Sequence, residues 1–329
     1  MSTEKPVIAI VAGGDSGEYD ISVKSAAVVK NHLDRTILDT YLVIIKGKDW
    51  NLVTDDGLAF PVDKDNFTVE LPGRTVRFDG VFIAVHGTPG EDGKLQGYFD
   101  MLGIPYTSCD QATSALTFDK FFCNHFVKSF GVNISSSIVL NKEDDIYEDE
   151  ILMKLHLPLF VKPGRGGSSV GTSKVKTSGE LRPAVARALK EDTRVMLEEH
   201  IPGRELSCGV ITFRGKVMSL PVTEIISHNE FFDYKAKYEG KSDEVTPADI
   251  PAPIAEEVSR TSVSLYHLLN CRGMVRFDYI LNGDKLFFLE VNTVPGMSEL
   301  SIVPQQALKA GISLRDLFTE TMLAALNTR

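Results

Sequence analysis

The sequence has few cysteines, a deficit of positive charge and no long apolar segment. The four cysteines, Cys109, Cys123, Cys208 and Cys271, are far apart, so their spacing argues against a zinc site and favours buried, reduced thiols. Lysine and arginine number 35 against 45 aspartates and glutamates, which gives a formal net charge of −10. Because that charge repels polyanions, we expect no nucleic acid and no membrane as a partner. No apolar run approaches the roughly 20 residues of a membrane-spanning helix.

The N-terminus also lacks the basic-then-apolar order of a secretory signal, and a strand is predicted to begin at once, at Val7. We therefore expect a cytoplasmic protein. The composition, 43% hydrophobic and 24% charged, is ordinary for a globular chain, and 329 residues suit two or three domains.

The first block of the chain predicts an open α/β sheet. Residues 7–12 (VIAIVA) form a continuous apolar run, as in a strand that is buried on both faces. The order strand, helix, strand that follows is typical of such sheets, whose ligands bind at the carboxyl ends of the strands. The predicted strands are 7–12, 41–45 and 80–85, and the predicted helices are 20–33 and 95–102.

Helices and strands mix after about residue 110. An amphipathic helix is predicted at 118–130. Residues 227–251 are polar and lack a clear period, which is typical of a functional or disordered segment. Asn282-Gly283 predicts a hairpin between strands at 274–281 and 285–291. The remaining predicted elements are strands at 159–162, 172–175, 195–198, 206–213 and 216–222, and helices at 179–189 and 254–269.

A glycine- and serine-rich loop, residues 164–171 (GRGGSSVG), follows Lys162. Glycines allow backbone N–H groups to turn toward an anion, and Ser168 and Ser169 add hydroxyl donors. The loop is not a Walker A motif, because no Gly-Lys-Ser/Thr follows. A flexible surface hairpin is the alternative, but four glycines behind a lysine favour a phosphate-binding loop.

The predicted hairpin carries charged residues among apolar ones. Since side chains alternate along a strand, Arg276 and Asp278 share one face, as do Glu290 and Asn292, although the sequence leaves the register open. Two carboxylates and an amide oxygen suit Mg²⁺ or Mn²⁺, and Arg276 can stabilise charge on a phosphoryl group or an oxyanion. Solvated surface charge is the alternative, and the apolar neighbours argue against it.

Three other segments are weaker candidates. Residues 13–18 (GGDSGE) lie between a strand and a helix, so they predict either an anion-binding loop or a tight structural turn. His86 ends a buried strand in a glycine-rich segment, where it is either a ligand contact or a structural histidine. The acid pair Glu198 and Glu199, with Glu205, either binds a nucleoside or belongs to a solvated loop.

Four motifs, in this order, resemble the ATP-grasp superfamily and, within it, the D-alanine–D-alanine ligase family. They are GGxSxExxIS at 13–22, HGxxGEDGxLQG at 86–97, GSSVG at 167–171 and EVNTxPGM at 290–297, and the resemblance covers nearly the whole chain. It implies an α/β fold, α+β in part, of the ATP-grasp type. The three implied domains are an N-terminal Rossmann-like open sheet (1–108), a central ATP-grasp domain with the Gly/Ser loop (109–198) and a C-terminal ATP-grasp domain with a lid at 227–251 and the metal site (199–329).

The resemblance also implies a role for individual residues. ATP would be held by Lys120, Lys162, Ser168, Ser169, Glu198, Glu199, Ile201 and Glu205, and the metal by Asp278, Glu290 and Asn292. Glu18, Ser168 and Tyr238 would form a hydrogen-bonded trio that orders the lid, and Arg276 with the backbone of Gly296 would form an oxyanion site. His86 would face the first D-alanine, and Lys237 and Ser301 the carboxylate of the second.

The implied reaction is ATP- and Mg²⁺-dependent (or Mn²⁺-dependent) joining of two D-alanine molecules through an acyl phosphate, with two metal ions, in a homodimer that supplies peptidoglycan synthesis. Tyr238 resembles the tyrosine of ligases that make the dipeptide, which implies an amine rather than D-lactate as second substrate. Two rivals are an ATP-grasp ligase with another acid and amine, and an ATP-binding sensor without turnover. Competent residues at every charged position argue against the sensor.

Overall fold

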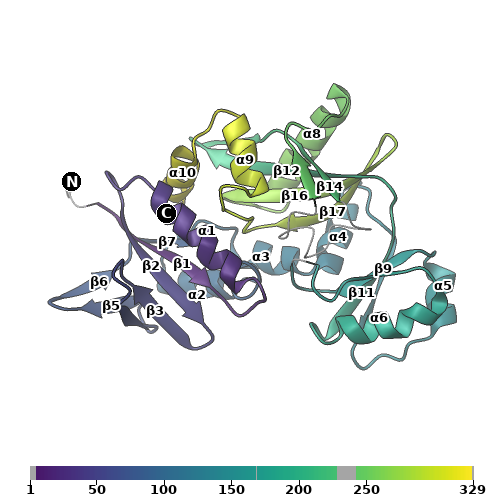
Figure 1. Cartoon of the computed structure of the whole chain (residues 1–329), viewed down its shortest axis with the longest axis horizontal. Coiled ribbons are helices and arrows are strands. Elements are labelled where there is room, and N and C mark those ends of the chain that lie inside the picture. Colours follow the sequence, from purple (N-terminus) through teal and green to yellow (C-terminus); the bar gives the residue numbers. More distant parts are fainter. Residues whose placement is uncertain (1–4, 168, 228–241, 328–329) are drawn as a thin grey trace.

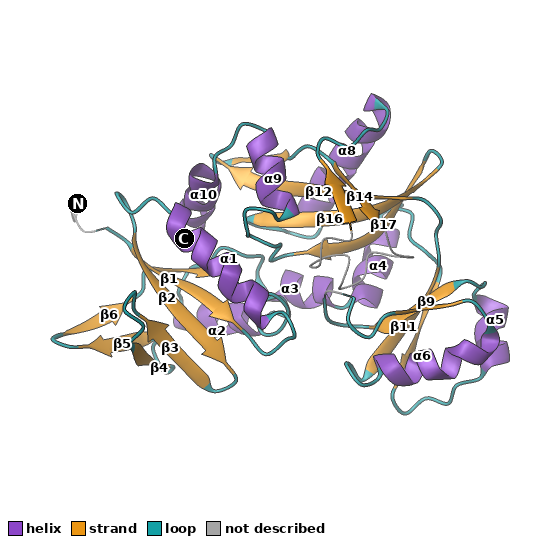
Figure 2. Cartoon of the chain, viewed as in Figure 1, coloured by secondary structure: helices purple, strands orange, loops and turns teal. Residues whose placement is uncertain are grey.

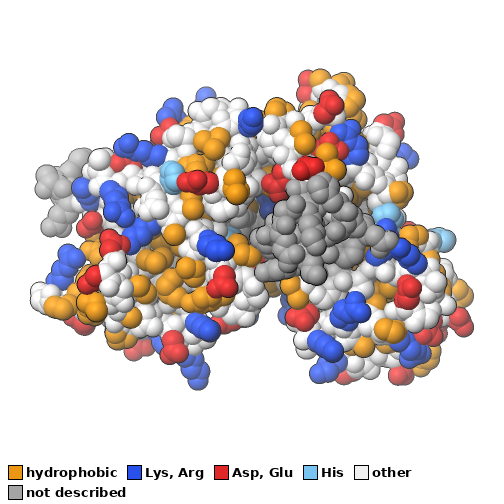
Figure 3. All heavy atoms as spheres, viewed as in Figure 1, with side chains coloured by type: hydrophobic (Ala, Val, Ile, Leu, Met, Phe, Trp, Pro, Cys, Tyr) orange, Lys and Arg blue, Asp and Glu red, His pale blue; other side chains and the backbone are white. Residues whose placement is uncertain are grey.

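The computed structural model of the chain describes residues 5–167, 169–227 and 242–327. They form three β-sheets, which fall within residues 7–83, 137–199 and 204–292. The first and second sheets lie at opposite ends of the molecule, and the third lies between and above them (Figure 1). In the space-filling view a notch separates the two ends (Figure 3). The limits of the three predicted domains stay a prediction.

The N-terminal sheet is built around its first strand. β1 (Val7–Gly13) pairs parallel with β2 (Asp39–Lys46) on one side and with β7 (Gly80–Ile83) on the other. Its apolar run is buried, as the sequence predicts. Helix α1 (Tyr19–His32) packs against β1, and α10 (Leu314–Leu326), from the far end of the chain, packs against β7 and α1. The other elements are β3 (Asp49–Val53), β4 (Ala59–Asp63), β5 (Thr68–Leu71) and β6 (Arg74–Arg77), which extend the sheet with antiparallel strands, and α2 (Lys94–Leu102).

The second sheet is antiparallel and has four strands in the order β10-β9-β11-β8. Helices on one face supply Ile151, Leu181 and Val185 to a small core of their own (Figure 2). The Gly/Ser loop connects two neighbouring strands of this sheet, so it leads from strand to strand. The elements are β8 (Ser137–Asn141), α5 (Glu148–Lys154), β9 (Leu159–Pro163), β10 (Ser173–Val175), η1 (Ser178–Glu180), α6 (Leu181–Ala188) and β11 (Arg194–Glu199).

The third sheet contains the predicted hairpin. β16 (Met274–Asn282) and β17 (Lys285–Asn292) pair antiparallel, with Asn282 opposite Lys285, so the turn at Asn282-Gly283 is confirmed. α3 (Gln111–Phe118) and α4 (Lys120–Lys128) pack against β17. The other elements are β12 (Arg204–Phe213), β13 (Lys216–Ser219), β14 (Thr223–Ser227), β15 (Ser242–Val245), α8 (Ala252–Leu268) and α9 (Ile302–Lys309).

Two local predictions need correction. The helix predicted at 118–130 begins only at Lys120, because Asp119 is extended and its side chain caps α4 by accepting from the Phe122 N–H at 3.1 Å. The segment predicted to be irregular, 227–251, contains β15, which pairs with β14; residues 228–241 lie outside the described part of the chain. All four cysteines are free and buried. Of the described helices, none is long and apolar enough to cross a membrane.

Candidate active site

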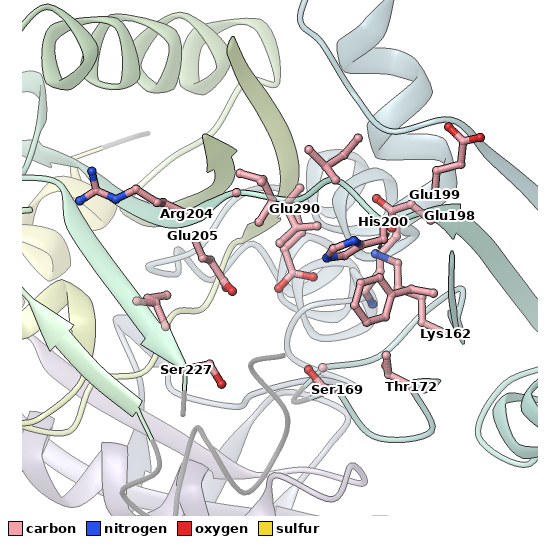
Figure 4. A pocket seen from close by; sticks show the side chains of 18 of the residues that line it. Lys162, Ser169, Thr172, Glu198, Glu199, His200, Arg204, Glu205, Ser227 and Glu290 are labelled. Carbon is pink, nitrogen blue, oxygen red and sulfur yellow. Dashed lines mark ion pairs between the residues drawn. The ribbon is translucent and has the colours of Figure 1, made fainter. Parts of the chain in front are cut away.

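A cavity of about 440 Å³ lies between the second and third sheets. That volume is within the range of small-molecule sites. β9, the loop after it and the end of β11 line one side, and β12, β14 and β17 line the other (Figure 4). The cavity therefore brings together residues that the sequence placed far apart. Those predicted to bind ATP or metal are Lys120, Lys162, Ser169, Glu198, Glu199, Ile201, Glu205 and Glu290. Ser168 lies outside the described residues.

Lys162 and Glu198 form an ion pair in the cavity wall (Figure 4). They come from the adjacent strands β9 and β11, and their side chains are only 11% and 5% exposed. Burying a charge is costly unless an opposite charge accompanies it. The pair thus holds the ammonium group at the cavity surface, and its further donors remain suited to a phosphate.

Lys120 reaches the Gly/Ser loop from the start of α4. Its Nζ donates to the carbonyl oxygen of Gly166, and its backbone N–H donates to that of Gly164 at 3.0 Å. Glu18 approaches the same loop from the N-terminal sheet, since a Cβ on Gly167 would lie 2.7 Å from Glu18 Oε2. The predicted partners of Glu18, which are Ser168 and Tyr238, lie outside the described residues, as does Lys237.

The predicted nucleoside contacts differ in their orientation. Ile201 and Glu205 line the cavity. The Glu199 carboxylate instead accepts from the backbone N–H of His156 at 2.7 Å and is 2.6 Å from Nδ1 of that ring, and it turns away from the cavity (Figure 4). Its backbone is therefore the part left to face a nucleoside. Burial, with the Lys174 ammonium nearby, lowers the pKa of His200.

The β16–β17 register brings the predicted metal residues together. Arg276 is opposite Asn292, and Asp278 is opposite Glu290. A β-bulge follows Asp278, which shows where the hairpin departs from regular pairing. Convergence of the two pairs, which the sequence left dependent on register, is confirmed.

Asp278 is the centre of a buried hydrogen-bond network. Its carboxylate accepts two bonds in parallel from Arg276, Nε to Oδ1 at 2.9 Å and Nη2 to Oδ2 at 2.7 Å. Ser207 Oγ donates to Oδ1 at 2.7 Å, and Asn292 Nδ2 donates to Oδ2 at 3.0 Å. Burial alone lowers the pKa of Arg276, but the Asp278 carboxylate outweighs it and raises that pKa above its ordinary value, so the guanidinium stays charged.

The oxygen atoms available at this hairpin are of the kind that a hard divalent cation binds. Asp278 and Glu290 supply carboxylates and Asn292 an amide from facing positions of one hairpin. Within the described residues, no group of three His, Cys, Asp or Glu side chains is placed to hold a metal ion, so a metal site at this hairpin would need the amide as its third ligand. Its nitrogen faces Asp278; turning the amide over would present the oxygen.

The two glycine-rich segments of the N-terminal sheet meet at its edge. The Asp15 N–H donates to the Thr88 oxygen at 3.0 Å, and Ser16 Oγ donates to the His86 oxygen at 2.9 Å. The His86 ring is buried, and burial lowers its pKa despite the nearby Glu18 carboxylate. Burial therefore favours the neutral form of the ring. Its Nδ1 donates to the Val294 carbonyl and its Nε2 accepts from the Ser25 hydroxyl, both at 2.9 Å.

Glu91 holds the same backbone from its other side. Its carboxylate accepts from the Gly87 N–H at 2.7 Å and from the Val294 N–H at 3.2 Å. Side chains of the segment between β7 and α2 thus bind both the N–H and the carbonyl of Val294, two residues before Gly296. Burial and the Glu18 charge raise the pKa of Glu91 to about 8.

Gly296 and Ser301 lie against each other. A Cβ on Gly296 would come 2.7 Å from Ser301 Oγ, so a larger residue would crowd that hydroxyl. Ser301 precedes α9, and its hydroxyl is 2.8 Å from that of Ser298. The predicted oxyanion backbone and the predicted carboxylate contact are therefore neighbours.

Comparison with known proteins adds the family to this geometry. The model of the D-ala D-ala ligase N-terminus matches residues 7–109, and that of the C-terminus matches residues 126–323. A D-alanine–D-alanine ligase from Phocaeicola vulgatus is 44% identical over 317 residues, which are 96% of this chain and 98% of the relative. This chain belongs to the D-alanine–D-alanine ligase family of enzymes.

Solved structures of the family share the whole fold. The VanG D-Ala:D-Ser ligase from Enterococcus faecalis matches with a TM-score of 0.85 at 31% identity, over 98% of this chain and 100% of that one. A D-alanine–D-alanine ligase from Bacillus anthracis, in complex with ATP, matches with a TM-score of 0.78 at 27% identity, over 98% and 97% of the two chains. The ATP-grasp fold is thereby confirmed.

Three residues of this site are absent from the sequence predictions. Ser207 and Ser25 bind Asp278 and His86 across strands or helices whose pairing no local pattern reveals. Glu91 lies inside the motif at 86–97, and its place directly after Gly90 in that motif is the available signal.

Proposed function

We propose that this enzyme joins two D-alanine molecules to D-alanyl-D-alanine and cleaves ATP to ADP and phosphate, through an acyl-phosphate intermediate. The family supports a ligase of this kind, and the resemblance supports peptidoglycan precursor synthesis as its purpose. The observation that carries the proposal is the cavity: Lys120 and Lys162 face the β17 residue Glu290 across a space that suits a nucleotide. Asp278 and Arg276 lie directly beside that wall.

The residues divide the reaction between them. Lys120, Lys162 and the loop bind the phosphates of ATP, while the carboxylate of the first D-alanine attacks the terminal phosphorus and ADP leaves. The second D-alanine, as a free amine, then attacks the acyl carbon. Its tetrahedral oxyanion is stabilised by the Arg276 guanidinium and the Gly296 N–H, and collapse releases phosphate.

The remaining groups bind, orient and exclude water. We propose that Glu18, with Ser168 and Tyr238, orders the lid at 227–251, because water would hydrolyse the acyl phosphate. His86 borders the first D-alanine and holds Val294. Two Mg²⁺ (or Mn²⁺) ions, when bound to Asp278, Glu290 and Asn292, would neutralise charge on the transferring phosphate. Adenine and ribose are bound by Glu198, the Glu199 backbone, Ile201 and Glu205, the phosphates also by Ser169, and the second carboxylate by Lys237 and Ser301.

The proposed function is tested by measuring phosphate release from ATP in the presence of Mg²⁺, with and without D-alanine. We expect release only with D-alanine and one dipeptide per phosphate. ATP binding without D-alanine-dependent release would favour a sensor, and release with other amino acids but not D-alanine would favour another carboxylate–amine ligase.

The second substrate is tested in the same assay. We propose an amine, so the rate with D-alanine alone should exceed the rate of mixed product with D-lactate at neutral pH. D-serine is the informative amine to add, because the similar VanG structure is that of a D-Ala:D-Ser ligase. A higher rate with D-lactate would contradict the proposal.

Family membership also supports a cytoplasmic homodimer, which light scattering would detect as twice the mass of one chain.

A further inference from the structure

An ion pair between Arg194 and Asp119 connects the two sides of the nucleotide cavity. Arg194 is the first residue of β11 in the second sheet, and Asp119 precedes α4, which packs against β17 of the third sheet. Arg194 Nη1 donates to Asp119 Oδ2, and the two side chains are 22% and 6% exposed. Because α4 shares its core with the third sheet, through Cys123 for example, the pair crosses from one body to the other.

Backbone hydrogen bonds hold the first residue of the Gly/Ser loop, Gly164, to Arg194 itself and to the residue that follows Asp119. The Gly164 N–H donates to the Arg194 carbonyl at 2.9 Å. The Gly164 carbonyl accepts from the N–H of Lys120, the neighbour of Asp119, at 3.0 Å. The Arg194 guanidinium also lies over the Phe122 ring of α4, 4.4 Å from its centroid. A shift of Arg194 relative to Asp119 would therefore move the loop relative to Lys120.

We propose that Arg194 is a positioning residue for nucleotide binding, which acts through Asp119 to keep the Gly/Ser loop and Lys120 at the spacing that a triphosphate requires. This inference rests on the nucleotide site proposed above. Neither Arg194 nor Asp119 lines the cavity, so the effect has to pass through the loop and Lys120.

Variants can separate this role from simple support of the helix. Asp119 also caps α4, and asparagine is as good an N-cap as aspartate, so Asp119→Asn removes the charge and keeps the cap. Arg194→Gln removes the other charge, whereas Arg194→Lys keeps a positive charge in place. Arg182→Gln is the matched control, because Arg182 pairs with Glu148 at 2.9 Å on the exposed side of the same sheet.

The test is titration of the full chain with ATP and Mg²⁺ in a calorimeter, together with KM and kcat. We expect Asp119→Asn and Arg194→Gln each to weaken ATP binding about tenfold, and the double variant to be no weaker than the weaker single one, because both remove one interaction. Arg194→Lys should bind ATP more tightly than Arg194→Gln, Arg182→Gln should match the wild type, and kcat at saturating ATP should change less than about twofold.

If the pair only stabilised the fold, its loss would lower the melting temperature but would leave ATP affinity unchanged at temperatures well below it. Unchanged affinity in both Asp119→Asn and Arg194→Gln would overturn the inference, as would an equal loss in Arg182→Gln. If Arg194→Gln fails to fold, Asp119→Asn and Arg194→Lys give the same decision. A wild type that binds ATP without joining D-alanine would refute the proposed reaction and still leave this affinity test decisive.

Discussion

The proposed active site has two ends that hold their ionisable groups in different ways. The nucleotide end is the cavity between the second and third sheets, and the substrate end is the segment after β7 that contains His86 and Glu91. At the nucleotide end, opposite charges pair across neighbouring strands, as in Lys162 with Glu198 and Arg204 with Glu224. At the substrate end, Glu91 is bound by two backbone N–H groups and His86 by the Val294 carbonyl and the Ser25 hydroxyl, and burial shifts the pKa of each in the direction that favours its neutral form. The first end therefore compensates each buried charge with an opposite charge, whereas burial at the second end favours the neutral forms of its ionisable groups.

The hairpin that both ends share should give the largest effect. Glu290→Ala removes a proposed metal ligand opposite Asp278, so we expect kcat/KM to fall at least about 100-fold, as when charge stabilisation of several kcal/mol is lost. Phosphate release at varied Mg²⁺ measures this. Asp284→Ala, at the exposed turn of the same hairpin, is the control and should retain activity; equal loss in both variants would contradict a specific role for Glu290.

The substrate end should show a pH dependence of stability that depends on Glu91. Its pKa is raised from 4.5 to about 8, so the native state keeps a proton that the unfolded state loses. The contribution of Glu91 to the free energy of unfolding is therefore full below pH 4.5 and is lost as pH rises toward about 8. Between these pH values, the free energy of unfolding of the wild type should fall by at least about 2 kcal/mol because of Glu91, and Glu91→Gln should abolish this fall. Urea unfolding at several pH values measures both proteins.

Asp92→Asn is the control for that comparison, because the Asp92 carboxylate pairs with Lys94 near the surface. It should keep the pH dependence of the wild type. Parallel curves for the wild type and Glu91→Gln would show that Glu91 is not protonated in the native state, and the contrast between the two ends would fail.

Local patterns in the sequence predicted the parts of the site that lie within one element or one hairpin. Strand alternation places Asp278 and Glu290 on converging faces, and a Gly-Ser run after Lys162 marks the loop. Contacts between distant segments were not predictable, because strand register and domain packing are absent from local patterns. The contacts of Glu91 with Val294 and of Arg194 with Asp119 are of this kind.

The same limit explains the local errors. A helix at 118–130 follows from apolar spacing alone, but Asp119 gains more as a cap and ion-pair partner than as a helical residue. β15 has a short polar sequence, so only its pairing with β14 makes it a strand. The fold class needed no such contacts, because the apolar run of β1 and the motifs along the chain already predict it.

The nucleotide end should respond to loss of its own cation. Lys162→Gln leaves Glu198 without its partner and removes a proposed phosphate contact, so KM for ATP should rise about tenfold while KM for D-alanine stays within about twofold. Steady-state kinetics with each substrate varied measure the two constants. Lys190→Gln is the control and should match the wild type, because Lys190 is exposed and lies between α6 and β11. An equal rise in both Michaelis constants of Lys162→Gln would mean that the two ends are not separable.

The smallest effect should come from a variant at the substrate end, which should raise KM for D-alanine rather than KM for ATP. Ser301→Ala removes a proposed carboxylate contact beside Gly296, so KM for D-alanine should rise about fivefold with KM for ATP unchanged, as expected for one hydrogen bond. Ser298→Ala removes only the neighbouring hydroxyl and is the control. A rise in KM for ATP instead would contradict the division of the site into two ends.

A crystal structure with ADP and Mn²⁺ would show whether the metal and the phosphates bind at the β16–β17 hairpin, because anomalous scattering locates the metal independently of the nucleotide. We predict metal bound by carboxylate oxygens of Asp278 and Glu290 and by the Asn292 amide oxygen, with the phosphates between that hairpin and Lys120 and Lys162. Metal or phosphates bound away from this hairpin, or an Asn292 amide that still points its nitrogen at Asp278, would contradict this prediction.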